Sequence, residues 1–255
     1  MSGGSASQLA ERSLGGSVPH RLELEEWRRE YGVIAGITGA DDGFDLGLWG
    51  PKPGGDTMRM WKSFQDSFTP HFRQFVVSHQ QHGRLVGRSN GAHEGLVVSE
   101  GLDGHATTDR GILLTVLVAD CVPVYLFDPK SGALALLHAG WRGVAAGILE
   151  AGIEQLESVG VSGRKDIVMH CGVSICGSCY EVGVEVIEAV LGEHRNTAGT
   201  LDIRNALAEQ AAKLGMRKVT VSPLCTVHDS RLFHSFRTSG DEAGRMAAYL
   251  GMPLA

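Results

Sequence analysis

Three short stretches of the chain combine metal-ligand or nucleophile side chains with glycine. They cover residues 80–83, 119–123 and 138–143, with the sequences QQHG, ADCVP and HAGWRG. In the last two, an apolar run of strand type ends abruptly at Cys121 or His138. Loops at strand ends expose side chains that the sheet holds in place, so these are positions where chemistry is expected. The residue types suit metal ligation or nucleophilic catalysis by cysteine.

Each of these side chains also has an ordinary structural interpretation. A cysteine in an apolar run is typical of a small buried hydrophobe, and a histidine at a strand end is typical of a hydrogen-bonded structural residue. Trp141 fits a core position, Arg142 a surface charge and Asp120 a turn cap. No short zinc pattern of the C-x₂-C…H-x₃-H type accompanies them. The residues taken singly leave both interpretations open.

A second group of cysteines competes as a site. Cys171, Cys176 and Cys179 have the C-x₄-C-x₂-C spacing of a plant-type iron–sulfur loop, with Cys225 as the fourth ligand. Alternatively, Cys176 and Cys179 form a C-x-x-C redox pair. Because Cys171 ends an apolar strand pattern and the polar surroundings of a cluster loop are missing, we interpret this group as structural cysteines.

The elements that must position these residues are clearest in the middle of the chain. Apolar segments rich in branched residues, at 112–118, 122–127 and 133–138, predict strands buried on both faces. Further strands are predicted at 33–38, 75–78, 167–171, 218–221 and 232–236. Helices are predicted at 20–31, 56–68, 144–158, 183–191 and 202–214. The pattern indicates a mixed α/β fold, a sheet covered by helices.

Composition narrows the class of protein. The 255 residues carry 23 basic and 29 acidic side chains, a net charge of −6 that argues against a nucleic-acid partner. Five cysteines, an odd number, argue against a disulfide framework and for a reducing compartment, so we expect a cytoplasmic protein. The longest apolar stretch, 112–127, is too short and too interrupted to span a membrane. Residues 1–18 are expected to be a disordered tail and residues 19–255 a single catalytic domain.

Taken together, the motifs resemble those of a known bacterial family. VADCVPV at 118–124 and HAGWRG at 138–143, with Cys121 and His138 seventeen positions apart, are similar to the YfiH-type family. That family is also called the multicopper polyphenol oxidase or laccase-domain family. The similarity extends in order from about residue 75 to 250. It includes QHG at 81–83, DGHAT at 103–107, GVSI at 172–175, YEVG at 180–183, LD at 201–202, CT at 225–226, FHSFR at 233–237 and GR at 244–245.

The resemblance implies a fold and a metal site. The fold would be a single layered α/β/β/α domain with mixed sheets. One Zn²⁺ would be held by His82, Cys121 and His138, with Cu²⁺ as the alternative metal. One thiolate and two imidazoles suit zinc, and three protein ligands leave the fourth tetrahedral position open, as a catalytic site requires. Asp120 or a backbone carbonyl would orient a ligand histidine.

The resemblance also implies an activity on purine nucleosides. The reactions would be phosphorolysis of adenosine, inosine, guanosine and methylthioadenosine, together with deamination of adenosine. Cys121, His138 and Glu181 would be the catalytic residues, with Glu181 carrying protons for deamination. Tyr180 or Trp141 would stack on the purine. Phosphate would be bound by arginines, for which the candidates are Arg142, Arg237 and Arg245.

Some positions depart from the family pattern. Gly172 is followed by valine where the family usually has proline, and Thr238 stands where a second arginine is usual. The glycine-rich N-terminal signature survives only in part, over 38–48. The expected substrate contacts from both ends of the chain are therefore less complete than the metal ligands.

Three other functions stay open at the level of sequence. A copper-dependent polyphenol oxidase would need more histidine ligands, for which the candidates are His79, His105, His228 and His234. A metal-free hydrolase that edits peptidoglycan precursors would use Cys121 as nucleophile and His138 as base. A binding module with structural zinc would need a fourth ligand, Asp120 or Cys225. The sequence leaves the oligomeric state open.

Overall fold

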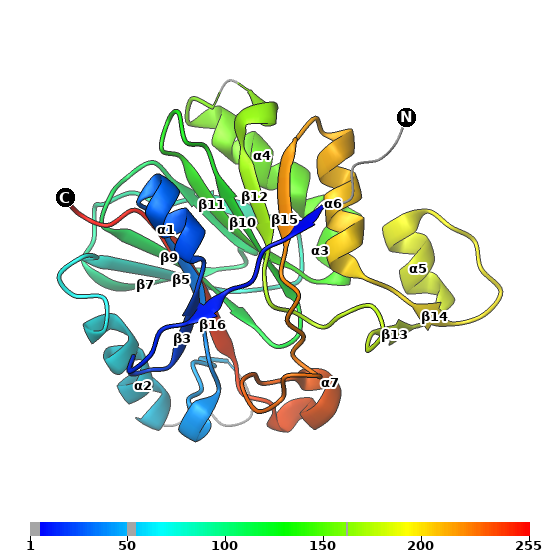
Figure 1. Ribbon diagram of the computed structural model, residues 1–255, viewed down its shortest axis with the longest axis horizontal. Coiled ribbons are helices and arrows are strands. Elements are labelled where there is room, and N and C mark those ends of the chain that lie inside the picture. The colour runs from blue at the N-terminus through cyan, green and yellow to red at the C-terminus, as the bar shows by residue number, and fades with distance from the viewer. Residues whose placement is uncertain (1–5, 50–54, 162) are drawn as a thin grey trace.

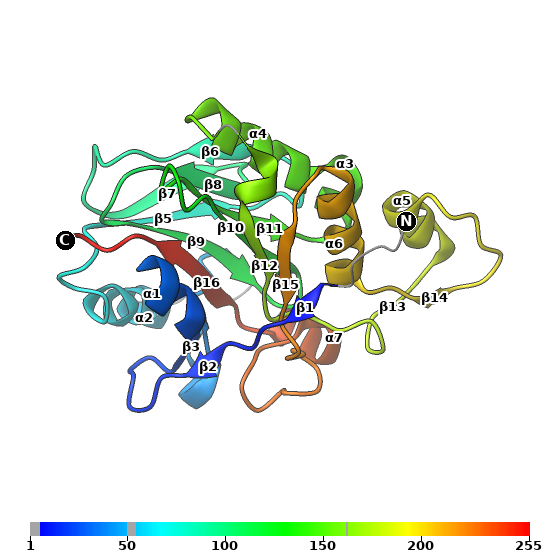
Figure 2. The ribbon, with the colours of Figure 1, turned by 45° about the horizontal axis from the view of Figure 1, so that its top comes forward.

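Two seven-stranded sheets lie face to face and carry helices on their outer sides (Figures 1 and 2). The computed structural model describes residues 6–49, 55–161 and 163–255, and the strands counted are those of these ranges. The first sheet has the order β1-β15-β12-β10-β11-β8-β6, and the second has the order β2-β3-β4-β16-β9-β5-β7. Both sheets mix parallel and antiparallel pairs.

The strands of the first sheet are β1 (Ser7–Gln8), β6 (Val86–Arg88), β8 (Gly104–Thr107), β10 (Val122–Phe127), β11 (Leu134–Ala139), β12 (Val168–Cys171) and β15 (Lys218–Val221). Those of the second are β2 (Arg12–Ser13), β3 (Arg21–Glu23), β4 (Ile34–Thr38), β5 (Gln74–His79), β7 (Gly95–Glu100), β9 (Ile112–Val118) and β16 (Met246–Gly251). A separate pair joins β13 (Glu181–Val182) to β14 (Gly199–Thr200).

The helices are α1 (Glu25–Tyr31), α2 (Gly55–Asp66), α3 (Trp141–Ala146), α4 (Ile148–Ser158), α5 (Val184–Leu191), α6 (Ile203–Lys213) and α7 (Phe236–Ser239). Short 3₁₀ turns cover Asp41–Gly43, Arg164–Asp166 and Gly240–Glu242. Within the described ranges, no helix combines the length and the apolar character needed to cross a membrane.

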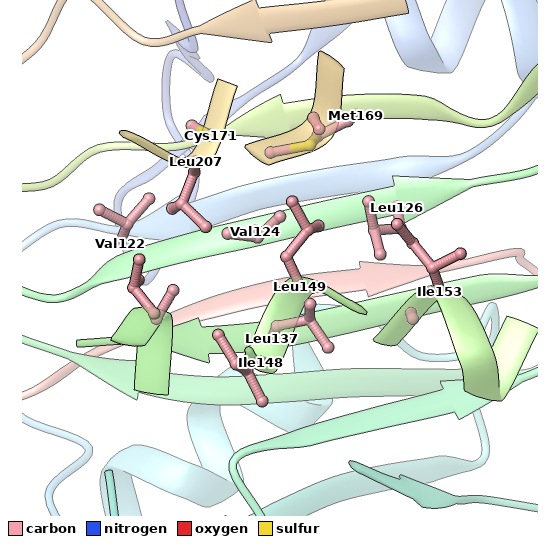
Figure 3. Close-up of a cluster of buried hydrophobic side chains, with 14 of the residues drawn as sticks. Val122, Val124, Leu126, Leu137, Ile148, Leu149, Ile153, Met169, Cys171 and Leu207 are labelled. Carbon is pink, nitrogen blue, oxygen red and sulfur yellow. The ribbon is translucent and has the colours of Figure 1, made fainter. Parts of the chain in front are cut away.

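The side-chain alternation of β10 shows how the layers are held together. Val122, Val124 and Leu126 point to the helical side, where they pack with α4 and α6 (Figure 3). Tyr125 and Phe127 belong to the core between the two sheets. Since both faces of the strand are buried, its sequence is apolar throughout, as in a strand covered on both sides.

The outer face of the second sheet packs on α2. Trp61 and Phe64 from this helix join Leu113, Leu117 and other residues of the second sheet in a third core. The order of layers is therefore helices, first sheet, second sheet, helix. The predicted mixed α/β/β/α architecture is confirmed.

Several predicted elements differ in detail. The helix predicted over 144–158 is two helices, α3 and α4, separated at Gly147, whose φ of 88° lies in the left-handed region that ends helices. The helix predicted over 20–31 contains a strand, β3, before α1.

The prediction of a strand over 232–236 is wrong. Leu232 and Phe233 donate their backbone N–H groups to the carbonyl of Asp229, so this segment is a turn that leads into α7. The last strand of the chain is instead β16, a central strand of the second sheet between β4 and β9. Its sequence, MAAYLG, lacks the β-branched residues that mark most strands.

Part of the segment expected to be a disordered tail forms strands. Of residues 1–18 the structure describes 6–18, in which β1 pairs with β15 and β2 pairs with β3. Glu11, which lies between β1 and β2 in the sequence, is buried with its carboxylate 3.1 Å from the Nε2 atom of His170. A buried carboxylate needs hydrogen-bonding or charged partners, and the contact with His170 therefore holds this polar segment against the first sheet. That residues 19–255 are one catalytic domain stays a prediction.

Candidate metal centre and its pocket

His82, Cys121 and His138 lie together where the chain crosses from one sheet to the other. Cys121 directly precedes β10, in the short link that follows β9. His138 is on β11, and the pairing of β10 with β11 places it opposite Pro123. His82 follows β5. The ligand atoms of the three residues all lie within 4.8 Å of one another.

Asp103 holds two of these residues in position. Its carboxylate accepts a hydrogen bond from Nδ1 of His138 at 2.9 Å, and the side chain is fully buried. The same carboxylate accepts backbone N–H bonds from Gln81 at 3.2 Å, His82 at 2.9 Å and Gly83 at 2.7 Å. Since Nδ1 of His138 is engaged by Asp103, Nε2 is the ring atom free to face Cys121.

The backbone of His82 adopts a conformation that side chains other than glycine rarely take. Its φ is 58°, in the left-handed region, and among the described residues it is the one non-glycine with positive φ. Three successive N–H groups bonded to Asp103 compensate for this conformation. Strain of this kind is found where the surrounding structure has to aim a functional side chain.

The charges of Cys121 and His138 are coupled. Burial acts to raise the pKa of the Cys121 thiol, but the positive charge and hydrogen bond of His138, with those of His82, outweigh it and lower the pKa to about 6. Burial acts to lower the pKa of His138, but the Cys121 thiolate and Asp103 raise it to about 9. The pair therefore favours a thiolate, the form of cysteine that binds metals and attacks electrophiles.

Positions 140 and 143, beside His82 and Cys121, require glycine because a side chain there would not fit. A Cβ atom on Gly140 would lie 3.0 Å from Sγ of Cys121 and 3.2 Å from Cδ2 of His82. On Gly143 it would lie 2.8 Å from the carbonyl oxygen of Gly83. The glycines of the HAGWRG motif thus let α3 begin against the two loops that carry His82 and Cys121.

The cluster lies in a pocket of about 690 Å³, a volume within the range of small-molecule sites. Its lining includes all three predicted phosphate-binding arginines, Arg142, Arg237 and Arg245. Both predicted stacking residues, Trp141 and Tyr180, line it as well. The fold therefore brings residues from three separate parts of the chain to one concave site.

The arginines differ in what holds them. The Arg142 guanidinium lies 4.3 Å from the ring centre of Trp141, and that of Arg237 lies 5.1 Å from the ring centre of Tyr180. Arg245 donates to the carbonyls of Ala243 and Gly244. Among the described residues, none of the three forms an ion pair with a carboxylate, so their positive charge is not neutralised by such a partner.

Two predicted residues have other surroundings. Glu181 is exposed and is not part of the pocket lining, although its backbone carbonyl accepts a hydrogen bond from Arg237 at 3.0 Å. Asp120 lines the pocket, but its carboxylate accepts from the Thr226 hydroxyl at 2.5 Å and from the Arg237 backbone N–H at 2.8 Å. Asp103, and not Asp120, orients His138.

The pocket also contains residues that sequence reasoning did not select as a pair. The Trp49 and His79 rings stack with centres 4.8 Å apart and an interplanar angle of 13°, and both line the pocket. They stand 30 residues apart in the sequence, and no spacing rule links them. Asp103 was visible only as part of the DGHAT string, whose chemistry depends on contacts with distant loops.

Comparison with known proteins places the chain. The model of the multi-copper polyphenol oxidoreductase laccase family matches residues 31–253. The chain belongs to this family. A purine nucleoside phosphorylase called YlmD from Bacillus subtilis is 27% identical, over 92% of this chain and 96% of its own length. A purine nucleoside phosphorylase called ORF3 from Streptomyces griseus is 36% identical, over 69% of this chain and 73% of its own.

Solved structures of the family share the fold. YlmD from Geobacillus stearothermophilus superposes with a TM-score of 0.87 at 24% identity, covering 95% of this chain and 98% of that one. The YfiH protein from Bacillus licheniformis gives a TM-score of 0.84 at 24% identity, covering 94% and 98%. The resemblance read from the motifs is thus confirmed for the family and for its fold.

Proposed function

We propose that this protein is a metal-dependent purine nucleoside phosphorylase, acting on adenosine, inosine, guanosine and methylthioadenosine. The observation that carries the proposal is the pocket itself, in which His82, Cys121 and His138 converge beside arginines and aromatic rings. The names of the relatives from Bacillus subtilis and Streptomyces griseus support the same reaction.

The donor set fits zinc. One thiolate and two imidazoles are ligands that Zn²⁺ prefers, and His138 has the carboxylate partner that such ligands commonly have. Within the described residues, the group at this place comprises these three side chains, the number typical of catalytic zinc. When bound, the ion would supply a Lewis acid to a nucleoside or phosphate group in the pocket.

In phosphorolysis, an oxygen of inorganic phosphate forms a bond to C1′ of the ribose while the C1′–N9 bond breaks. The bonding electrons pass to the purine, which takes up a proton and leaves as the free base with ribose 1-phosphate as the other product. Arg142 and Arg237 would bind the phosphate, since guanidinium groups hold phosphate oxygens by paired hydrogen bonds. Tyr180 and Trp49 offer aromatic faces to the purine.

Deamination of adenosine is proposed as a second reaction of the same pocket. Water would add to C6 of the purine and ammonia would leave, which gives inosine. Glu181 stays a prediction as the proton carrier. From its exposed position it would have to act through a movement of its strand or through water.

Multiple copper ions fit the described residues less well. His79 stacks on Trp49, His105 is buried against the Ser78 hydroxyl, and the Nε2 atom of His234 lies 2.9 Å from the carbonyl oxygen of Phe44. None of them belongs to the group formed by His82, Cys121 and His138. A single metal in the pocket is therefore the better proposal.

A metal-free hydrolase is the second candidate, favoured by one observation. Asp103, His138 and Cys121 are arranged in the order of a carboxylate, a base and a nucleophile, as in cysteine hydrolases. Such an enzyme would be inactivated by alkylation of Cys121, and zinc would not restore it.

The test is metal analysis combined with a nucleoside assay. Protein purified without an affinity tag is incubated with inosine and inorganic phosphate, and the products are separated by chromatography. We expect hypoxanthine and ribose 1-phosphate in equal amounts, formation that requires phosphate, and loss of activity on chelation that added zinc restores. Full activity in chelated protein, or phenol oxidation with bound copper and no release of base, would contradict the proposal.

A further inference from the structure

We infer that the chain holds a second zinc ion, structural in kind, at a site made by Cys176, Cys179, Cys225 and His228. These four residues are called the Cys–His cluster below. Their ligand atoms all lie within 4.8 Å of one another. The inference is independent of the proposed function, because none of these residues belongs to the group in the pocket.

The distances within the cluster suit one tetrahedral ion. Sγ of Cys179 lies 3.3 Å from Nε2 of His228, and Sγ of Cys176 lies 3.7 Å from Nδ1 of the same ring. Zinc bonds of about 2.3 Å to sulfur and about 2.0 Å to nitrogen place tetrahedral sulfur and nitrogen ligands about 3.5 Å apart. An imidazole binds an ion through one of its two nitrogens, and one ligand atom from each of the four residues lies within 4.8 Å of the others. Small rotations of the side chains would therefore let all four surround one ion.

The sequence spacing has the form of a structural zinc site. Cys176 and Cys179 form a C-x₂-C pair, and Cys225 and His228 form a C-x₂-H pair. Two such pairs supply four ligands, and a zinc ion that is enclosed by four protein ligands is structural in most proteins. The second pair departs from the H-x₃-H form of the short zinc pattern, because a cysteine stands in place of the first histidine.

Backbone hydrogen bonds hold the two pairs side by side. The N–H groups of Cys179 and Tyr180 donate to the carbonyl of Cys176, which closes the first turn. The N–H of Cys176 donates to Sγ of Cys225 at 3.3 Å, across 49 positions of sequence. Ser174 and Cys225 also form a parallel bridge. These hydrogen bonds keep the thiol of Cys225 beside the C-x₂-C pair.

Two other uses of these cysteines fit the structure less well. The iron–sulfur loop considered from the sequence needs Cys171, but this thiol is buried in the core beside Leu207 (Figure 3) and is not part of the cluster. A redox pair of Cys176 and Cys179 would not account for the presence of Cys225 and His228 at the same point. Three thiolates and one imidazole suit zinc.

The position of the cluster gives the second zinc a role. It lies between the segment that leads from β12 to Tyr180 and the segment that follows β15. Thr226, next to Cys225, donates to the Asp120 carboxylate, which also accepts from the backbone of Arg237. An ion joining the two segments would hold Tyr180 and Arg237 against each other at the wall of the pocket.

The first experiment measures the metal content of the tag-free protein by inductively coupled plasma mass spectrometry. We expect about two zinc ions per chain, and about one in His228→Ala and in Cys179→Ser. Cys121→Ser should also retain about one, and the double variant Cys121→Ser/His228→Ala none. The matched control is His93→Ala, an exposed histidine that belongs to neither group, which should keep both ions. The inference would be overturned if the wild type contained one zinc ion that His228→Ala and Cys179→Ser retained. It would also be overturned if the wild type contained stoichiometric iron that these two variants lacked.

The second experiment needs no substitution and so does not depend on the folding of a variant. Cys176 and Cys179 are half-buried and should react with an alkylating reagent in the native protein only after a zinc chelator is added. The modified cysteines are located by peptide mass spectrometry. Immediate alkylation of both without chelator, or a disulfide between them in protein prepared without reductant, would count against the zinc site.

Discussion

The two proposed metal sites of this protein differ in the number of ligands and in what holds them. They are the pocket cluster, made of His82, Cys121 and His138, and the Cys–His cluster. The pocket cluster has three proposed ligands from the ends of strands or the loops that follow them, and the buried Asp103 holds two of the three, His82 and His138. The Cys–His cluster has four, which come from two turns outside the sheets. Three ligands beside a cavity leave room for a substrate, whereas four ligands enclose an ion and leave room for none. Similar donor atoms are thus expected to serve catalysis in one place and stability in the other.

The largest expected effect separates the two clusters directly. Cys121→Ser removes the thiolate of the pocket cluster, and we expect activity to fall more than about 100-fold, beyond the range usual for residues that act through a ligand. Cys179→Ser, the matched variant, should lose the other ion and keep the pocket metal. Metal content and phosphorolysis of inosine are measured on both. If the two variants lost the same ion, the division into a catalytic and a structural cluster would be wrong.

The next effect tests the support of the pocket cluster. Hydrogen bonds from His138 and from the N–H groups of Gly83 and Gln81 overcome burial and keep the pKa of Asp103 below its ordinary value, so the residue is a carboxylate. In Asp103→Asn the amide group cannot accept all of these bonds. We expect a loss of about 10- to 100-fold in metal affinity or in activity, measured by competition with a chelator and by the nucleoside assay.

Asp109→Asn is the control for this substitution, since Asp109 also accepts a backbone N–H, from Gly91, but contacts no ligand. It should retain wild-type metal affinity. An equal loss in both variants would indicate a general effect on folding, not the positioning of His82 and His138.

A smaller effect is expected from the phosphate side of the pocket. Arg237→Ala removes a guanidinium that lies over Tyr180, and we expect the KM for phosphate to rise about 10-fold, the equivalent of one charged hydrogen bond. Steady-state kinetics at varied phosphate concentration provide the measurement. Arg231→Ala, an exposed arginine outside the pocket lining, is the control. A rise in the KM for the nucleoside alone would assign Arg237 to the purine instead.

The smallest effect on activity is expected from a buried pair outside both clusters. Burial acts to raise the pKa of Glu11, but the charge and hydrogen bond of His170 outweigh it and lower the pKa below its ordinary value. The stabilisation of the folded state by the Glu11 carboxylate is therefore fully present above about pH 4.5, the ordinary pKa, and is lost as the pH falls through the lowered pKa. Glu11→Gln should reduce the free energy of unfolding at pH 7 by about 1–3 kcal/mol, with activity per folded molecule unchanged.

Urea unfolding at a series of pH values checks this prediction. The difference between Glu11→Gln and the wild type should narrow as the pH falls below 4.5. Glu193→Gln breaks an ion pair with Arg195 that is half-exposed and should change stability by less than about 1 kcal/mol. A difference that stays constant down to acid pH would mean that the charge of Glu11 does not contribute.

Prediction from sequence succeeded where the determining interactions are local. The apolar runs of β9 and β10 identify buried strands because every residue in them faces a core. The central strand β16 was not predicted, because alanine has low strand propensity. Its strand conformation depends on pairing with β4 and β9. The burial of Glu11 was not predicted either, because its partner His170 lies 159 positions away in the sequence.

The sequence by itself determined the kinds of chemistry available: a cysteine and two histidines in motifs that resemble those of a metal-binding family, arginines suited to phosphate, and a mixed α/β fold. Only the tertiary structure decided which groups meet. It joined Asp103 to the loop of His82, brought Cys225 and His228 to Cys176 and Cys179, and left Glu181 outside the pocket lining. The physical reason is that ligand chemistry resides in single side chains, whereas a site requires several of them within a few ångströms, and that proximity follows from the packing of sheets and loops distant in sequence.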